Sequence, residues 1–121
     1  MEIDWSYLHL LTNDFPIMVT AFGILVLACA LITRRRVIWM FALATLAVAG
    51  LSTGPIGLFG DLGGDEVEAL KVVDQHKIDA HEDAAEWALW VLLAMGVVSA
   101  YALWRARRAL TASSSRAAVA A

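Results

Sequence analysis

Three stretches of the sequence contain no Asp, Glu, Lys or Arg, namely residues 16–33, 37–60 and 87–104. As a helix, each stretch is long enough to cross the hydrocarbon core of a bilayer, which takes roughly 17–25 residues. Charged residues make up 17% of the chain and apolar residues 60%, whereas a water-soluble domain carries about 25% charged residues. We therefore predict an all-α integral membrane protein, an antiparallel helical bundle of three transmembrane helices.

Local signals indicate where these helices begin and end. Asn13 and Asp14 are suited to cap the first helix, and Pro16 fits its first turn. The second helix must begin directly after a short basic turn, and glycines together with Pro55 weaken it from about Ser52 onward. We expect one domain over residues 1–110, with transmembrane helices at about 16–33, 37–58 and 86–104 and an amphipathic, extracytoplasmic helical segment at about 65–85.

The final segment, residues 111–121, is rich in Ala and Ser. Two interpretations remain open at this stage. The segment is either a cytoplasmic tail or the start of a fourth helix in a truncated chain.

The charged residues are divided between the two ends of the predicted helices. All twelve acidic residues and both lysines fall at one end, and all the arginines fall at the other. Short loops rich in Arg stay in the cytoplasm. We therefore expect a multi-pass protein of the bacterial cytoplasmic membrane, with the N-terminus and the acidic 61–86 loop outside and the C-terminus inside. The arginines are Arg34, Arg35, Arg36, Arg105, Arg107, Arg108 and Arg116.

The three histidines, His9, His76 and His81, fall on the outer side and are the candidate metal ligands, because imidazole commonly binds haem iron, copper and zinc. His76 and His81 point about 140° apart around a helix, so they do not clamp one ion together. His81 heads the face predicted to turn into the bundle, and His9 reaches a similar height if the first helix extends outward. Two such histidines are candidates for holding a b-type haem. The alternative is that each is an amphipathic residue at the headgroups, with no ligand.

Other chemistries are excluded by residue spacing. His81 and Glu82 begin like the helix of a zinc protease, but the position of the second histidine holds Ala85. Cys29 is the single cysteine, so the chain has neither a disulfide nor a covalent haem site. No acidic residue lies within the three charge-free stretches, which argues against a transporter or pump. We predict no catalytic residues and no nucleic-acid partner.

Three short motifs lie in order at the membrane edges: His9-Leu-Leu-Thr-Asn13-Asp-Phe-Pro16, Thr53-Gly54, and Ala80-His81-Glu82-Asp-Ala84-Ala85-Glu86. Over about residues 7–105 this pattern resembles small bacterial membrane proteins of the domain of unknown function 2231 type. The resemblance implies a four-helix bundle and electron transfer with Rieske-type or cytochrome partners. Two departures stand out, since Asp14 replaces a histidine of the family's opening motif and the fourth helix is missing. The matching positions are His9, Asn13, Pro16, Thr53, Gly54, His81 and Glu82.

These observations lead to three hypotheses. The first is a small non-catalytic subunit of a bacterial membrane electron-transfer assembly, with a b-type haem between His9 and His81. The second is a structural or accessory membrane subunit without a cofactor, whose small-residue faces pack on partner helices or on further copies of the chain. The third is a metal-handling protein that uses the acidic loop with His76 and His81. In each case the expected surroundings are a lipid bilayer.

Overall fold

A computed structural model describes residues 4–69 and 75–119, and side chains over 4–63, 76–77 and 79–112. The chain forms four helices, α1 (Trp5–Thr12), α2 (Asp14–Thr33), α3 (Arg36–Ala69) and α4 (Gln75–Val119). Within the described residues only Asp4, Asn13, Arg34 and Arg35 lie outside a helix, so the all-α prediction is confirmed. Three helical stretches are long and apolar enough to cross a membrane, namely Trp5–Thr33, Arg36–Gly63 and Asp79–Ala112.

The first helical stretch begins earlier than predicted. The carboxylate of Asp4 accepts a hydrogen bond of 2.8 Å from the backbone N–H of Tyr7 and so caps α1. Asn13, the expected cap of α2, makes no side-chain capping bond. Its backbone N–H instead donates to the carbonyl of His9, at 2.8 Å. The chain therefore turns from α1 into α2 with almost no break, and Pro16 is buried in the first turn of α2, where its missing N–H costs no helical bond.

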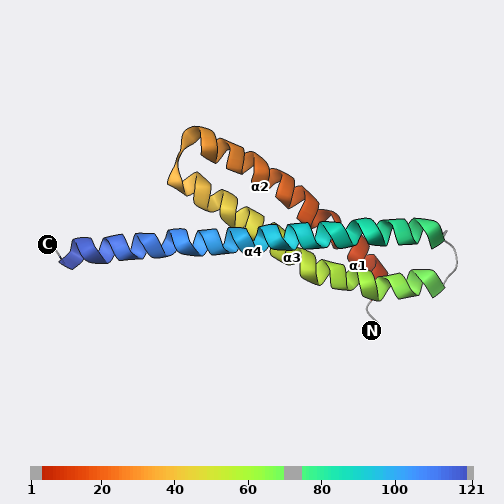
Figure 1. The fold of residues 1–121 in the computed structure, drawn as a ribbon. Helices are drawn as coiled ribbons and strands as arrows, with labels where there is room; N and C mark the ends of the chain where they lie inside the picture. Colours follow the sequence, from red (N-terminus) through yellow and green to blue (C-terminus); the bar gives the residue numbers. More distant parts are fainter. Residues whose placement is uncertain (1–3, 70–74, 120–121) are drawn as a thin grey trace.

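The predicted short basic turn joins α2 to α3. Arg34 adopts the left-handed conformation, with φ 53°, and its N–H donates to the carbonyl of Ala30. The carbonyl of Arg35 then accepts bonds from the N–H groups of Ile38 and Trp39 and opens α3. Because the turn is this short, α2 and α3 run in opposite directions side by side (Figure 1).

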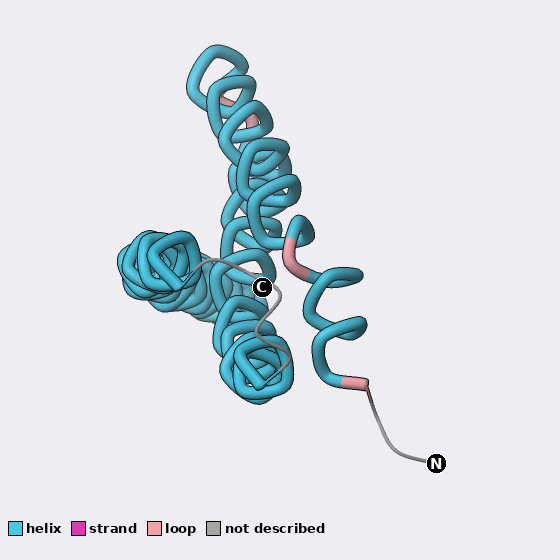
Figure 2. Tube along the Cα trace, turned by 90° about the vertical axis from the view of Figure 1, so that its right-hand side faces the viewer, coloured by secondary structure: helices cyan, strands magenta, loops and turns pink. Residues whose placement is uncertain are grey.

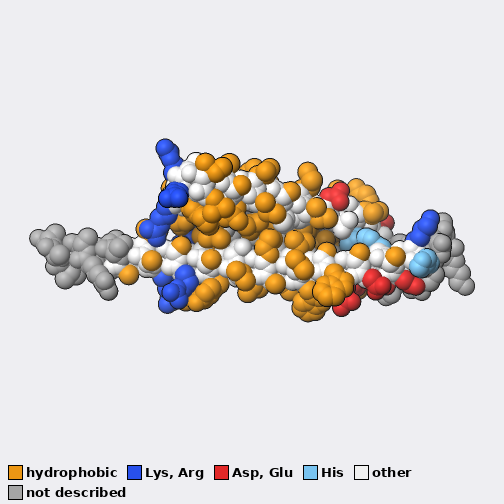
Figure 3. Space-filling view, turned by 45° about the horizontal axis from the view of Figure 1, so that its top comes forward, with side chains coloured by type: hydrophobic (Ala, Val, Ile, Leu, Met, Phe, Trp, Pro, Cys, Tyr) orange, Lys and Arg blue, Asp and Glu red, His pale blue; other side chains and the backbone are white. Residues whose placement is uncertain are grey.

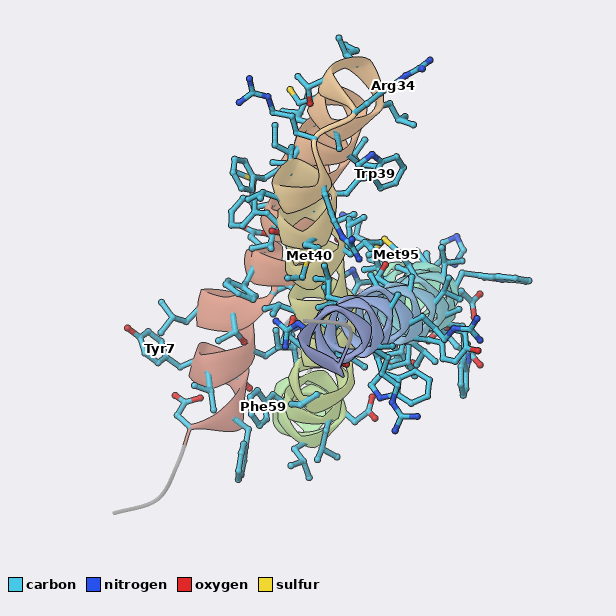
Figure 4. The ribbon with its side chains drawn as sticks, turned by 90° about the vertical axis from the view of Figure 1, so that its left-hand side faces the viewer. Tyr7, Arg34, Trp39, Met40, Phe59 and Met95 are labelled. Atoms are coloured by element: carbon cyan, nitrogen blue, oxygen red, sulfur yellow. The ribbon has the colours of Figure 1, made fainter. Side chains whose placement is uncertain are left out.

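Helix α3 is longer than the predicted 37–58 helix, because it continues through the glycine-rich segment to Ala69. Pro55 lies inside it and has no N–H to donate to the preceding turn. The hydroxyls of Ser52 and Thr53 both donate to the carbonyl of Ala49, at 2.8 and 3.1 Å. Figures 1 and 4 show that α3 is bent, so that its C-terminal part runs along α4 while its N-terminal part leans away with α2. An internal proline accounts for a bend without ending the helix.

Helix α4 extends well beyond the predicted 86–104 helix at both ends. It begins at Gln75, so it takes up much of the surface segment predicted at 65–85, and it runs to Val119. Residues 111–119 therefore continue α4 as a helix. The sequence has no Gly or Pro after Gly96 and is rich in Ala and Arg, both of which favour a helix.

The helices pack around α3, which contacts α4, α2 and α1. Figure 2 shows α1 and α4 on different sides of the C-terminal part of α3. The closest approach is between Gly50 of α3 and Gly96 of α4, where a Cβ atom on Gly50 would lie 2.5 Å from the Gly96 Cα atom. Only glycine allows backbones to come this close. One turn before Gly50 in α3, the side chain of Leu46 packs against Gly23 of α2.

Candidate functional site

The candidate ligand His9 lies on α1 with its ring against α3. Its Nδ1 atom is 3.2 Å from the backbone carbonyl oxygen of Ile56. A carbonyl oxygen only accepts, so Nδ1 carries the proton and, in the neutral ring, Nε2 is the acceptor. The ring is half-buried and lies over Gly60, where a Cβ atom would come within 2.8 Å of the His9 Cε1 atom. The His9 ring of α1 therefore packs directly against Gly60 of α3, where the absence of a side chain leaves room for it.

Two further contacts flank His9 and hold α1 against the same part of α3. The hydroxyl of Ser6 donates to the carbonyl of Gly63, at 3.1 Å, and a Cβ atom at Gly63 would come within 2.9 Å of the Ser6 backbone. The rings of Trp5 and Phe59 stack with their centroids 5.8 Å apart. In Figure 4, Phe59 extends from α3 toward α1, whereas Tyr7 points away. We call this set of contacts the α1–α3 clamp; it comprises Trp5, Ser6, His9, Ile56, Phe59, Gly60 and Gly63.

The other two histidines, His76 and His81, are exposed side chains on α4. Helix α4 packs on α3 on a different side from α1 (Figure 2). The contacts described for the His9 ring join it to α3, and none joins it to His81. The bundle-facing placement predicted for His81 therefore differs from its exposed position in the structure.

The described residues contain no group of three or more His, Cys, Asp or Glu side chains close enough to hold a metal ion. Half of the side chains of the acidic 61–86 loop, those of residues 64–75 and 78, lie outside the described part of the chain, as does the side chain of Arg116. The structure thus supplies no preformed metal centre among the side chains that it places.

The remaining motif residues occupy different environments. The buried Thr53 hydroxyl donates to the carbonyl of Ala49, at 3.1 Å, and Gly54 beside it faces open space. Asp14 and Glu82 are exposed, and Asn13 is half-buried at the α1–α2 junction. The motif residues at 53 and 54 therefore lie at the bend of α3, whereas those at 13, 14 and 16 lie at the turn between α1 and α2.

Sequence reasoning missed the glycines of the clamp, which it treated only as helix breakers. Gly60 and Gly63 are three residues apart and so share the side of α3 that meets α1. That spacing is the available signal for a close helix contact. A similar signal is weaker at the α3–α4 crossing, because Gly50 and Gly96 are far apart in the sequence.

The charges separate along the molecule as predicted. On the face shown in Figure 3, arginines gather at one end, acidic and histidine side chains gather toward the other, and the surface between them is apolar. An open depression of about 270 Å³ lies near the acidic end and is lined by Glu86, Trp87 and Trp90. Neither His9 nor His81 lines this depression.

Comparison of the chain with known protein families, curated proteins and solved structures gave no match. The resemblance to proteins of the domain of unknown function 2231 type therefore rests on the short motifs alone.

Proposed function

We propose that this chain is a membrane-spanning, non-catalytic accessory subunit whose helices pack against partner membrane helices. The observation that carries the proposal is the α1–α3 clamp. His9, a candidate cofactor ligand, makes a structural contact instead: its Nδ1 atom bonds to the Ile56 carbonyl and its ring packs on Gly60. Its environment resembles helix packing more than an open ligand pocket.

The exposed surface supports insertion in a bilayer. The chain has an accessible surface of 9032 Å², compared with about 6,400 Å² for a compact soluble protein of 13.1 kDa. In the most apolar windows of the three membrane-length stretches, 17%, 33% and 11% of the residues are buried. Large apolar side chains such as Ile32 and Val98 are 82% and 67% exposed. Lipid tails or partner helices would cover this surface, because an apolar surface of this extent is unfavourable in water.

The arginines support the orientation. Six of them belong to the α2–α3 turn and to α4 beyond Trp104, all at one end of the apolar surface (Figure 3). By the positive-inside rule this end faces the cytoplasm, and α1 with the acidic residues faces outward. A membrane-impermeant maleimide tests this orientation in a Cys29→Ser background. Lys77→Cys should react in intact cells, and Arg107→Cys should react only in inverted vesicles.

A partner can be tested by site-specific crosslinking in native membranes. A photoreactive residue at Val98, exposed in the middle of α4, should give a product with a defined membrane protein that also co-purifies at fixed stoichiometry. The same residue at Tyr7, which points away from α3 at the outer edge, serves as the control. Recovery of a monodisperse monomer, with lipid adducts alone at Val98, would contradict the accessory role.

Electron transfer with a b-type haem at His9 and His81 is a second candidate, because one observation favours it. Ligating histidines commonly donate the other ring nitrogen to a backbone carbonyl, and His9 has this arrangement, which leaves Nε2 as the ligand atom. Haem ligation would require His81 to approach from α4. A Soret band in the purified protein that is lost in His9→Gln and in His81→Gln, and retained in His76→Gln, would establish this candidate over the first.

A further inference from the structure

We propose that the arginines of the α2–α3 turn, of the first residue of α3 and of α4 bind the phosphate groups of anionic phospholipids in the leaflet at their end of the molecule. This inference rests on the membrane insertion proposed above. The arginines concerned are Arg34, Arg35, Arg36, Arg105, Arg107 and Arg108, which we call the basic end.

The charge of the basic end has no counterpart within the chain. No Asp or Glu occurs between residues 15 and 60 or after Glu86. Arg36 is the first residue of α3, where the helix dipole is positive and an acidic residue is the favourable choice, whereas Arg34 caps the negative C-terminus of α2. Anions from outside the chain can therefore balance this end.

Three of the guanidinium groups are held in place by one contact each. An Nη atom of Arg36 donates to the carbonyl of Ala106 on α4, at 3.0 Å, so this side chain bridges α3 and α4. Arg105 lies 3.3 Å from the Tyr101 hydroxyl, and Arg108 stacks on the Trp104 ring, 4.2 Å from its centroid.

Each of these contacts restricts the position of its guanidinium group. Because a guanidinium has five N–H donors, donors remain for a ligand. Ordering a side chain in advance lowers the entropy cost of binding. The three anchored guanidinium groups are thus better ordered for binding than freely rotating surface side chains.

The residue type indicates phosphate. Every cation at this end is Arg, whereas both lysines lie at the other end. The planar guanidinium matches the oxygens of a phosphate in a bidentate manner, which an ammonium group does not. The aromatic rings of Tyr101 and Trp104 are at this level of α4, and aromatic residues of this kind lie at headgroup depth. The phosphodiester found at headgroup depth is that of the phospholipids. We expect the basic end to prefer anionic lipids over zwitterionic ones, because the cationic headgroup of a zwitterionic lipid would be repelled by the arginines.

Native mass spectrometry of the full chain tests the proposal, with equimolar phosphatidylglycerol and phosphatidylcholine in mild detergent. Wild-type protein should retain phosphatidylglycerol preferentially. Arg36→Gln should lower that preference about fivefold, the factor expected for one cation at an anionic membrane surface. Lys77→Gln removes one charge at the opposite end and should leave the preference unchanged, and Arg36→Lys should restore only part of it.

Two results would overturn the inference. One is an equal lipid preference in Arg36→Gln and Lys77→Gln, with both variants matching wild type in helix content and elution. The other is loss of the preference when millimolar inorganic phosphate is added, since this would assign the site to a soluble anion. A chain that stays soluble and monomeric without detergent would instead refute membrane insertion, which separates failure of the proposed function from failure of lipid binding.

Discussion

Substitution of Gly50 by Ala tests the helix crossing on which the fold depends. An added Cβ atom would overlap the carbonyl oxygen of Leu92 and lie 2.5 Å from the Cα and N atoms of Gly96. These are backbone atoms, so no side-chain rotation relieves the overlap. Carbon atoms in good contact are about 3.5 Å apart, so α3 and α4 must separate by about 1 Å at the crossing.

The magnitude follows from two opposing effects. Overpacking of this kind costs about 1–3 kcal/mol. Replacing glycine by alanine within a helix gains up to about 1 kcal/mol. Gly54→Ala is the control, because it is on the same helix and, apart from its chain neighbours, a Cβ atom there meets nothing within 4 Å. Since Pro55 follows Gly54, alanine gains less helix propensity there than at position 50. The difference between the two variants therefore gives a lower limit on the cost of the crossing, which we expect to be about 1–3 kcal/mol.

The assay is unfolding in mixed micelles of mild detergent and dodecyl sulfate, followed by tryptophan fluorescence and circular dichroism. Gly54→Ala should unfold at the same or a higher dodecyl sulfate fraction than wild type, and Gly50→Ala at a lower one. Gly96→Ala should resemble Gly50→Ala, because its Cβ atom would lie 2.8 Å from the Gly50 carbonyl carbon. Equal unfolding free energies for Gly50→Ala and Gly54→Ala would refute a backbone contact at this crossing.

Three further predictions concern other parts of the molecule. Gly63→Ala should detach α1, because the added Cβ atom meets the Ser6 backbone at 2.9 Å, and hydrogen exchange of the α1 amides should rise while that of α4 amides does not. Arg34→Gly should stabilise the chain by about 1 kcal/mol in zwitterionic detergent, because it removes a side chain from the left-handed conformation; Arg35→Gly should not, and equal effects would count against this reasoning. Cys29, exposed on α2 within the apolar surface, should react with a membrane-soluble maleimide and not with a charged one, and rapid labelling by the charged reagent in intact vesicles would disprove its contact with lipid.

The sequence predicted the three membrane-length helices well, because absence of charge over a long stretch is a strong signal. It predicted helix ends poorly. Pro55 and the surrounding glycines indicated a break, yet α3 continues to Ala69. Local signals cannot show that these glycines receive another helix at close range, since that depends on contacts between Gly60 and His9 and between Gly63 and Ser6.

The candidate site was predicted in part. The sequence indicated that His9 could lie on an outward extension of the first helix, and the structure places it in α1. The exposed position of His81 was not predicted, because a stripe of small residues on one helix does not identify which face its neighbour covers. The anchoring of Arg36 on Ala106 was equally beyond the sequence, since those residues meet only through the packing of α3 on α4.

In the proposed function, His9 is a structural residue that holds α1 on α3. Nitrogen NMR of the purified protein with ¹⁵N-labelled histidine, recorded alongside its visible spectrum, tests this role. We expect a proton on Nδ1 of His9, a coupling from Nδ1–H to the Ile56 carbonyl, and no Soret band. A Soret band together with a His9 signal shifted by bound iron, or a proton on Nε2 alone, would contradict it.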